Sequence, residues 1–415
     1  KNFVIKINIM KVKFNLPKKV IFCKNCVMSN QRPSSIPEFR HKKNREGANY
    51  LKIDTKTGWC SACLQNKIKQ KINWNFREKQ LEKLLSKFRK NNGEYDCLIP
   101  GSGGKDSAYQ AHILKYKYKM NPLLITWPPI LYTDYGLKNY NNWVNIGGFD
   151  SLVYRPNGKV MRLLTKLSIE NLLHPFQTFI LGQKNLAPKI ASKFNINLVF
   201  YGENEAEYGN PIAENETSLR SNSYFVSDNI NSLYLAGIKI KKLVKEFDLS
   251  LNDLKIFLPI EHKELKRKKI QIHYLGYYLK WIPQEAYYYA VKNTGFKPRP
   301  FRTQGTYSKY NSIDDKIDDL HYYTTFIKFG LGRATYDSSQ EIRNGHLLRE
   351  EAKNLVKKYD GEYPDIYIDE VLKYINLDKD KFHKLCDEFR SDHLWKKTKN
   401  GWKLRHSVNF DGTDD

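Results

Sequence analysis

Short apolar runs and longer amphipathic segments alternate along the middle of the chain. Three apolar runs have the length of buried strands: 96–100, 121–127 and 197–202. Three longer segments repeat their apolar residues every three to four positions, as helices with one buried face do: 75–90, 161–173 and 176–194. Strands that alternate with helices indicate an α/β fold, with a parallel sheet covered by helices on both faces.

The rest of the chain predicts one more strand and then mainly helices. We expect the strand at 270–281, with a helix that begins near Pro283. The apolar pattern beyond it predicts three helical stretches: about 311–330, 338–358 and 369–390. Residues 212–235 are polar and irregular, which indicates an inserted loop.

A turn rich in glycine and hydroxyls, Gly-Ser-Gly-Gly-Lys-Asp-Ser at 101–107, joins the first strand to the next helical pattern. Glycine permits a tight turn and leaves backbone N–H groups uncovered, and the following helix begins with its positive end. Together these features form an anion site. Ser102 and Ser107 add hydroxyl donors, Lys105 adds a positive charge, and Asp106 is placed to hold Mg²⁺ beside phosphates.

Residues 102–107 match Ser-Gly-Gly-x-Asp-Ser, so the turn resembles the loop of the PP-loop ATP pyrophosphatases. In that superfamily ATP is split between its α- and β-phosphates, which gives an adenylylated substrate and pyrophosphate. A glycine-rich surface turn is the alternative, but a strand before it and a helix after it favour the ATP site. Ligands in such folds gather where the strands end, so Trp127, Gly202 and Glu203 are expected beside the loop. For Trp127 a simple core position is an equal alternative.

Four of the six cysteines form two Cys-x-x-Cys pairs, Cys23/Cys26 and Cys60/Cys63, separated by 33 residues. Two such pairs can complete a tetrahedral site of four thiolates for structural Zn²⁺. A redox-active or iron–sulfur set, or unliganded thiols, are the alternatives. The long spacer contains a polar insert in which His41 is expected to be a loop residue rather than a ligand.

The net charge of +26 suggests nucleic acid as a partner. However, the lysines are spread along the whole chain, and the densest basic run, 262–269, contains a glutamate. This distribution favours a solvated face over a nucleic-acid site. No apolar run approaches the ~20 residues that span a bilayer, and the start of the chain is too interrupted for a secretory signal. We therefore expect a cytoplasmic protein in which residues 1–9, before Met10, are an upstream extension.

Taken together, the motifs resemble the N-acetyl sugar amidotransferases of bacterial surface-polysaccharide biosynthesis, including that of the lipopolysaccharide O-antigen. The resemblance spans nearly the whole chain. Beyond the loop and the cysteine pairs, it rests on Arg32-Pro33 and on six blocks: 132–136, 174–183, 201–204, 275–281, 305–310 and 314–316. It implies an adenine nucleotide alpha-hydrolase-like sheet that follows an N-terminal zinc ribbon and precedes a helical C-terminal region.

The resemblance also implies a reaction, in which the acetamido group of a nucleotide-linked sugar becomes an acetamidino group. ATP would adenylylate the amide oxygen, and ammonia would then displace AMP. The residues implied to bind ATP are Ser102, Gly103, Gly104, Lys105, Asp106, Ser107, Trp127 and Gly202. The implied catalytic residues are Lys105, Asp106, Glu203 and Lys316, and the implied substrate contacts are His174 and Gln177. His174 precedes a proline, so a place beside a helix cap is its alternative. Further cations expected to face phosphate are Arg299, Arg302, Arg333 and Arg343.

Glutamine hydrolysis needs an activated nucleophile, usually a cysteine with a nearby histidine. With the zinc candidates set aside, only Cys97 and Cys386 remain, in a strand and a helical pattern where thiols are usually packed. We therefore expect no glutaminase activity in this chain. As in the family it resembles, a separate glutaminase subunit would supply ammonia through a barrel-like channelling subunit.

Two other functions stay open from the sequence. A tRNA-modifying PP-loop ATPase would use the same loop to adenylylate a base, and a zinc-ribbon interaction protein would bind ATP only as a structural ligand. For either function the expected regions are the same: an extension at 1–17, the zinc ribbon at 18–74, the ATP pyrophosphatase domain at 75–300 and the helical region at 301–415.

Overall fold

The computed structural model describes residues 11–33, 50–209, 217–220, 227 and 229–409. Its centre is a sheet of five parallel strands in the order β3-β2-β1-β4-β7. The strands are β1 (Cys97–Pro100), β2 (Pro122–Thr126), β3 (Asp150–Val153), β4 (Leu198–Tyr201) and β7 (Gln271–Tyr274). The chain runs outward from β1 to β3 and then returns to place β4 on the other side of β1. This order puts a topological switch point, where ligands gather in such sheets, at the carboxyl end of β1.

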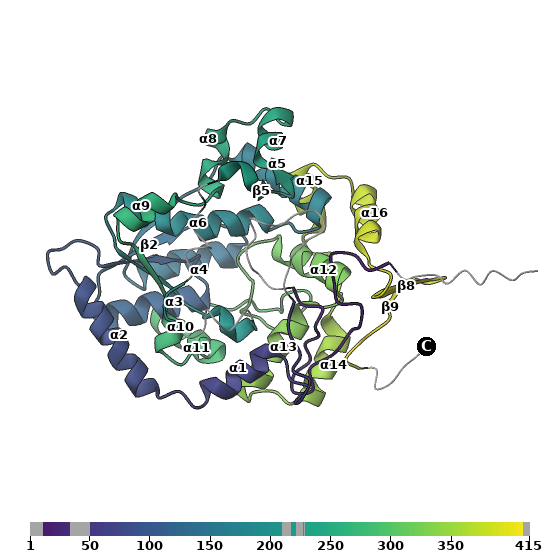
Figure 1. Ribbon diagram of the computed structural model, residues 1–415, viewed down its shortest axis with the longest axis horizontal. Helices are drawn as coiled ribbons and strands as arrows, with labels where there is room; N and C mark the ends of the chain where they lie inside the picture. Colours follow the sequence, from purple (N-terminus) through teal and green to yellow (C-terminus); the bar gives the residue numbers. More distant parts are fainter. Residues whose placement is uncertain (1–10, 34–49, 210–216, 221–226, 228, 410–415) are drawn as a thin grey trace, which may run out of the picture.

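Helices cover both faces of the sheet, so the α/β class expected from the sequence is confirmed (Figure 1). Because side chains alternate along a strand, Leu98 and Val199 point into one core. Cys97, Ile99 and Phe200 point into the core on the opposite face. The helices that pack in the first core are α5 (Gly158–Leu172) and α6 (Gln177–Lys193). Those in the second are α2 (Trp74–Phe88), α3 (Lys105–His112), α4 (Asp134–Asn145) and α11 (Pro283–Thr294).

The strands expected at 96–100, 121–127 and 197–202 and the helices expected at 75–90, 161–173 and 176–194 are confirmed. Strand β3 and helix α4 were not expected. Strand β3 lies at the sheet edge, where two of its four residues are exposed and two are half-buried, so it has no apolar run. The expected strand at 270–281 was wrong in its second half, because helix α10 (Leu275–Tyr278) follows β7 directly. The backbone N–H of Gly276 donates to the carbonyl of Gly202 (2.8 Å), which turns the chain there.

The C-terminal region is helical, as expected, but its helices are shorter than the pattern predicted. They are α12 (Asp318–Phe329), α13 (Arg333–Asn344), α14 (Arg349–Tyr359), α15 (Ile368–Ile375) and α16 (Lys379–Phe389). Gly345 (φ +80°) and Asn376 (φ +52°) are left-handed residues that end α13 and α15, so each of two expected helices is divided. A hairpin of β8 (Trp395–Thr398) and β9 (Gly401–Leu404) was not expected. The C-terminal helices share a hydrophobic core of their own. In it Phe14, from the expected extension, stacks on Phe389, with 5.6 Å between ring centroids.

The two cysteine pairs lie in the described residues 18–33 and 50–73, here called the cysteine-rich segment. This segment packs between the sheet domain and the C-terminal helices (Figure 1). Helix α1 (Ser61–Lys69) begins directly after Cys60 and contains Cys63, the other member of the second cysteine pair. The amide of Asn66 on this helix donates to the carbonyl of Arg343 at the end of α13 (2.7 Å). His41 lies outside the described residues, and so does most of the loop expected at 212–235.

The connection between β4 and β7 holds short elements only. They are β5 (Tyr234–Leu235), β6 (Ile238–Lys239), α7 (Ile240–Glu246), α8 (Leu251–Leu254) and α9 (His262–Arg267). Throughout the described part of the chain, no helix combines the length and apolar character needed to cross a membrane.

Candidate active site

The loop at 101–107 leaves the carboxyl end of β1 and enters helix α3, as its sequence predicted. Gly103 has φ +86°, and a Cβ there would lie 2.7 Å from the Cα of Tyr140, so only glycine fits. The hydroxyl of Ser107 donates to the carbonyl of Gly104 (3.0 Å), which tightens the turn from within. The loop therefore exposes backbone N–H groups at the start of a helix, the arrangement that binds phosphate.

Lys105 and Asp106 form an ion pair at the start of α3, with 2.5 Å between Nζ and Oδ2. Lys105 is buried, whereas Asp106 is about one-third exposed at its side chain. The second carboxylate oxygen of Asp106, Oδ1, is itself buried and accepts no hydrogen bond from any described residue. A buried carboxylate oxygen without a donor suits a cation such as Mg²⁺, which prefers oxygen ligands.

Three adjoining cavities surround the loop. The first, here called the loop cavity, has a volume of about 380 Å³ and lies directly over the loop. Besides loop residues, its walls include Gln110, Gln183, Gly202, Glu203, Tyr208 and Arg220. Arg220 is buried, with its guanidinium 4.5 Å from the ring centroid of Tyr201. No sequence pattern pointed to Arg220, because it lies in a polar stretch interpreted as an inserted loop.

A second cavity of about 260 Å³, here called the apolar cavity, shares Gly101, Gln183 and Arg220 with the loop cavity. Its walls are mainly hydrophobic, from Ile125, Trp127, Ile180, Leu186 and Ala187. Trp127 is only 3% exposed and packs edge-on against Phe257 (5.4 Å). It is therefore a core residue whose ring also forms part of this cavity wall.

The third cavity, here called the arginine cavity, has a volume of about 300 Å³ and lies between three parts of the chain. It shares Ser102, Gly104, Asp106, Glu203 and Tyr208 with the loop cavity, so the two adjoin. The cysteine-rich segment contributes Met28, Arg32, Leu51 and Ala62. The C-terminal region contributes Asp314, Arg333, Asp337 and Arg343 among others.

Glu203 lies at the boundary between the loop and arginine cavities. The hydroxyl of Tyr208 donates a hydrogen bond to its Oε2. Its crowded, desolvated surroundings, together with the negative charge of Asp106, raise the pKa of Glu203 to about 7. A carboxyl with such a pKa can accept or release a proton near neutral pH. The structure thus places Glu203 beside the loop, where the sequence expected it.

Two of the additional cations expected to face phosphate line the arginine cavity: Arg333 and Arg343. The others do not line the three cavities. The Arg299 guanidinium donates to the carbonyl of Ile313 (3.2 Å), and Arg302 pairs with Glu362 (2.5 Å).

Lys316, His174 and Gln177 do not line these three cavities. The ammonium of Lys316 binds both carboxylate oxygens of Glu370, at 2.8 and 2.9 Å. Two residues earlier, Asp314 lines the arginine cavity. The expectation for Lys316 therefore named the right block of sequence but not the residue that faces the site.

His174 and Gln177 lie at the start of α6. The His174 ring stacks on that of His321 (4.8 Å). Gln177 is fully buried, and its Oε1 accepts from the backbone N–H of Ala236 (2.8 Å), so its amide holds the β5–β6 turn. From the same block of sequence it is Gln183 that reaches the loop cavity.

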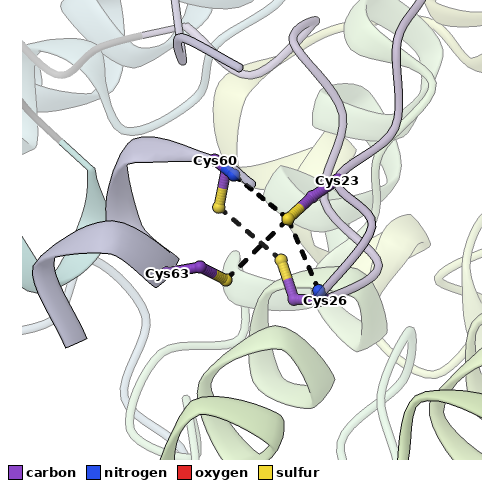
Figure 2. Close-up of side chains that lie close together, drawn as sticks. All are labelled: Cys23, Cys26, Cys60 and Cys63. Atoms are coloured by element: carbon purple, nitrogen blue, oxygen red, sulfur yellow. Dashed lines mark hydrogen bonds between the residues drawn. The ribbon is translucent and has the colours of Figure 1, made fainter. Parts of the chain in front are cut away.

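The four expected metal ligands, Cys23, Cys26, Cys60 and Cys63, are all buried and gather in one cluster (Figure 2). Their sulfurs lie within 4.8 Å of one another. Two of the separations are 3.9 Å, between Cys23 and Cys63, and 3.7 Å, between Cys26 and Cys60. A tetrahedral ion with metal–sulfur bonds of about 2.3 Å separates its sulfurs by about 3.8 Å. The cluster therefore fits a single tetrahedral metal ion.

Backbone N–H groups support the same conclusion. Those of Cys60 and Asn25 donate to the sulfur of Cys23, at 3.1 and 3.4 Å. Such donors stabilise thiolate, the form that binds metal. In a four-iron cluster each thiolate binds a different iron, so its sulfurs stand farther apart than those on one ion. The observed sulfur–sulfur distances therefore disfavour an iron–sulfur cluster at this site.

Cys97 and Cys386 are buried and line none of the three cavities. Burial raises the pKa of both thiols, that of Cys386 to about 12. Neither has the surroundings of an activated nucleophile.

Comparison with known proteins gives a match to a family model and partial likenesses to curated proteins and solved structures. Residues 304–409, about a quarter of the chain, match the C-terminal domain of the LPS biosynthesis protein WbpG-like family. A stretch of 66 residues is 38% identical to the uncharacterized protein MJ1599 of Methanocaldococcus jannaschii. That stretch covers 16% of this chain and 24% of the archaeal protein, so the chain spans about a quarter of that relative.

Two solved structures are partly similar. One is the U34-tRNA thiolase NcsA from Methanococcus maripaludis with its 4Fe-4S cluster, at 13% identity and a TM-score of 0.31, over 73% of this chain and 86% of that one. The other is NMN synthetase from Francisella tularensis, at 16% identity and a TM-score of 0.26, over 60% and 93%. At these scores neither likeness carries an argument about the chain. The match at residues 304–409 does: this region is similar to a WbpG-like C-terminal domain, which supports the family resemblance that the sequence indicated.

Proposed function

We propose that this protein is an ATP-dependent amidotransferase that converts the acetamido group of a nucleotide-linked sugar into an acetamidino group. One observation carries the proposal: Ser102, Asp106 and Glu203 form a wall common to the loop cavity and the arginine cavity. A nucleotide bound over the loop would therefore meet a second substrate at that wall. The sequence resemblance and the WbpG-like domain support the choice of a sugar as that substrate.

ATP occupies the loop cavity with its phosphates and the apolar cavity with its adenine. The exposed N–H groups of the loop and the guanidinium of Arg220 face the phosphates, and Ile125 and Trp127 provide an apolar surface for the base. Asp106 Oδ1 would hold Mg²⁺, which neutralises phosphate charge when bound. Lys105, fixed by its ion pair with Asp106, lies at the arginine-cavity side of the same loop.

The chemistry follows from the weakness of an amide as an electrophile. The amide oxygen attacks the α-phosphorus of ATP, the bond to the β-phosphate breaks, and pyrophosphate leaves. The amide proton is lost, which gives an O-adenylyl imidate. Ammonia then attacks the imidate carbon, and AMP departs with the former amide oxygen. Glu203 is the group suited to take a proton from the attacking nitrogen, because its raised pKa lies near neutrality.

The ammonia comes from a separate glutaminase, which delivers it through a barrel-like channelling subunit. The buried thiols of Cys97 and Cys386 support this division, since neither is placed to attack glutamine. They also argue against the tRNA thiolation alternative, which needs a reactive cysteine near the loop. The ion in the four-cysteine cluster is Zn²⁺ with a structural role, since four thiolates leave no open position on the metal.

Pyrophosphate release measured with different acceptors tests the proposal. The purified chain is incubated with ATP, Mg²⁺ and ammonium at raised pH, and with either nucleotide-linked N-acetyl sugars or bulk tRNA. We expect sustained release with a sugar, none with tRNA, and no more than about one pyrophosphate per chain when glutamine replaces ammonium, because pyrophosphate leaves before ammonia attacks. Release that depends on tRNA would overturn the sugar assignment, and turnover of glutamine by the isolated chain would overturn the need for a partner.

A further inference from the structure

The cysteine-rich segment forms a wall of the arginine cavity as well as a metal site. Arg32 lies six residues after Cys26 and lines the cavity together with loop residues Ser102 and Lys105. The backbone N–H of Leu51 donates to the carbonyl of Arg32 (2.9 Å), which joins the parts of the segment that carry the first and second cysteine pairs. The guanidinium is thus carried on a backbone that the metal site holds in place.

Arg32 is a buried cation without a carboxylate partner. It is 8% exposed, and within the described parts of the chain its side chain forms no ion pair or hydrogen bond. Among the described residues, the guanidinium lies over two aromatic rings. Its carbon is 5.9 Å from the ring centroid of Tyr208 and 5.4 Å from that of Tyr336.

Two other cations on the same cavity wall differ from Arg32, because each has a carboxylate partner. Lys105 is paired with Asp106 (2.5 Å), and Arg333 with Asp337 (2.8 Å). A buried charge without a partner is costly, and rings offset only part of that cost. Arg32 therefore has unused donors at the cavity, and an anionic ligand would satisfy them.

We propose that Arg32 binds a phosphate group in the arginine cavity. The planar guanidinium can donate two parallel hydrogen bonds to phosphate oxygens, and the Tyr208 and Tyr336 rings hold it in a fixed orientation. This inference rests on the proposed function, which supplies two sources of phosphate: the diphosphate of the nucleotide-linked sugar and the pyrophosphate that leaves ATP. Since Tyr208 also donates to Glu203, the same ring joins the anion site to the proposed proton acceptor.

Calorimetric titration of the full-length, metal-loaded protein distinguishes the two sources. In one arm uridine diphosphate is titrated into protein saturated with α,β-methylene-ATP, so that the loop cavity is already filled. In the other arm inorganic pyrophosphate is titrated into protein saturated with AMP. Arg32→Gln is compared with the unchanged protein, with Arg32→Lys and with Arg390→Gln. Arg390 is a matched control, because it is also buried and stacked on rings but pairs with Asp387 far from the loop in sequence.

We expect Arg32→Gln to weaken binding in one arm by about 10- to 100-fold, the usual loss for a charged hydrogen-bonding group. Arg32→Lys should lose less, because it keeps the charge but not the planar fork. Arg390→Gln should bind as the unchanged protein does. The arm that responds identifies the source of the phosphate.

Unchanged affinity of Arg32→Gln in both arms would overturn the inference, as would the absence of binding in both arms for the unchanged protein. If Arg32→Gln loses its metal or its fold, Arg32→Lys decides in the same way. These binding measurements need no turnover. Failure of the proposed function would appear instead as the absence of pyrophosphate release from ATP.

Discussion

The ammonium of Lys69 lies 2.8 Å from a carboxylate oxygen of Glu207, and both side chains are largely buried. Lys69 ends helix α1, which begins directly after Cys60. In the sequence Glu207 lies between Glu203 and Tyr208, which both line the loop cavity. Lys69 also donates to the carbonyl of Trp281 (2.5 Å). One side chain thus joins the cysteine-rich segment to the part of the sheet domain that carries Glu203.

Replacement of Lys69 by methionine should destabilise the protein by about 3 kcal/mol, because it leaves the buried Glu207 carboxylate without its partner. The measurement is the first urea unfolding transition, followed by tyrosine and tryptophan fluorescence. Lys90→Met is the control, since Lys90 pairs with the exposed Glu94 and solvent screens such surface pairs. Equal losses of unfolding free energy in the two variants would contradict the prediction that the buried Lys69–Glu207 pair stabilises the protein more than a surface pair does.

The four-cysteine cluster predicts about one zinc ion per purified chain. Cys60→Ser should lose the metal and lower the thermal unfolding temperature, because metal binding contributes to folding. Metal analysis by mass spectrometry and a thermal scan check both outcomes, with Cys97→Ser as the control for loss of a buried thiol outside the cluster. Iron with the absorption of an iron–sulfur cluster, or metal-free protein of unchanged stability, would contradict this assignment.

Local sequence was enough to find the parts of the site whose chemistry is contiguous. The loop at 101–107 contains its glycines, hydroxyls, cation and acid within seven residues, and each cysteine pair is a unit of four. In the structure the loop lies between a strand and a helix, and the two cysteine pairs meet around a common centre. Three of the five strands, β1, β2 and β4, were predictable for the same reason, since each is an apolar run.

The residues that reach the site through packing were not predictable from local sequence. Arg32, Tyr208 and Arg220 lie in segments without apolar periodicity, and only the packing of several segments brings them together. Lys316 shows the limit most clearly. Asp314, two residues away, lines the cavity, whereas Lys316 binds Glu370, and no pattern in a single sequence decides between neighbouring residues of one motif.

Asp106→Asn should lower pyrophosphate release by at least about 100-fold while the fold remains intact. The substitution removes the charge that pairs with Lys105, and it leaves only a neutral amide oxygen where a carboxylate oxygen is proposed to hold Mg²⁺. Initial rates at saturating ATP measure the loss, and circular dichroism checks the fold. Asp134→Asn, an exposed acid in the first turn of α4, and Lys316→Ala should each stay within about threefold of the unchanged rate. A large loss in Lys316→Ala would restore that residue to the active site.

The raised pKa of Glu203 predicts a pH dependence of stability. In the folded protein this carboxyl keeps its proton up to a pKa of about 7, whereas its ordinary value is 4.5. Between these values the folded state binds more protons than the unfolded state, so stability falls as pH rises from about 4.5 to 7. The free energy of unfolding at pH 5 and pH 8 should therefore differ more in the unchanged protein than in Glu203→Gln. Parallel pH profiles for the two proteins would contradict the raised pKa.

The most direct test follows the oxygen of the acetamido group. A nucleotide-linked N-acetyl sugar labelled with ¹⁸O at the acetamido carbonyl is incubated with the protein, ATP, Mg²⁺ and ammonium, and the nucleotide products are analysed by mass spectrometry. If ATP activates the amide oxygen, AMP and pyrophosphate form, and the AMP carries one ¹⁸O atom for each amidine made. Unlabelled AMP, or ADP and phosphate in place of AMP and pyrophosphate, would contradict the proposed reaction.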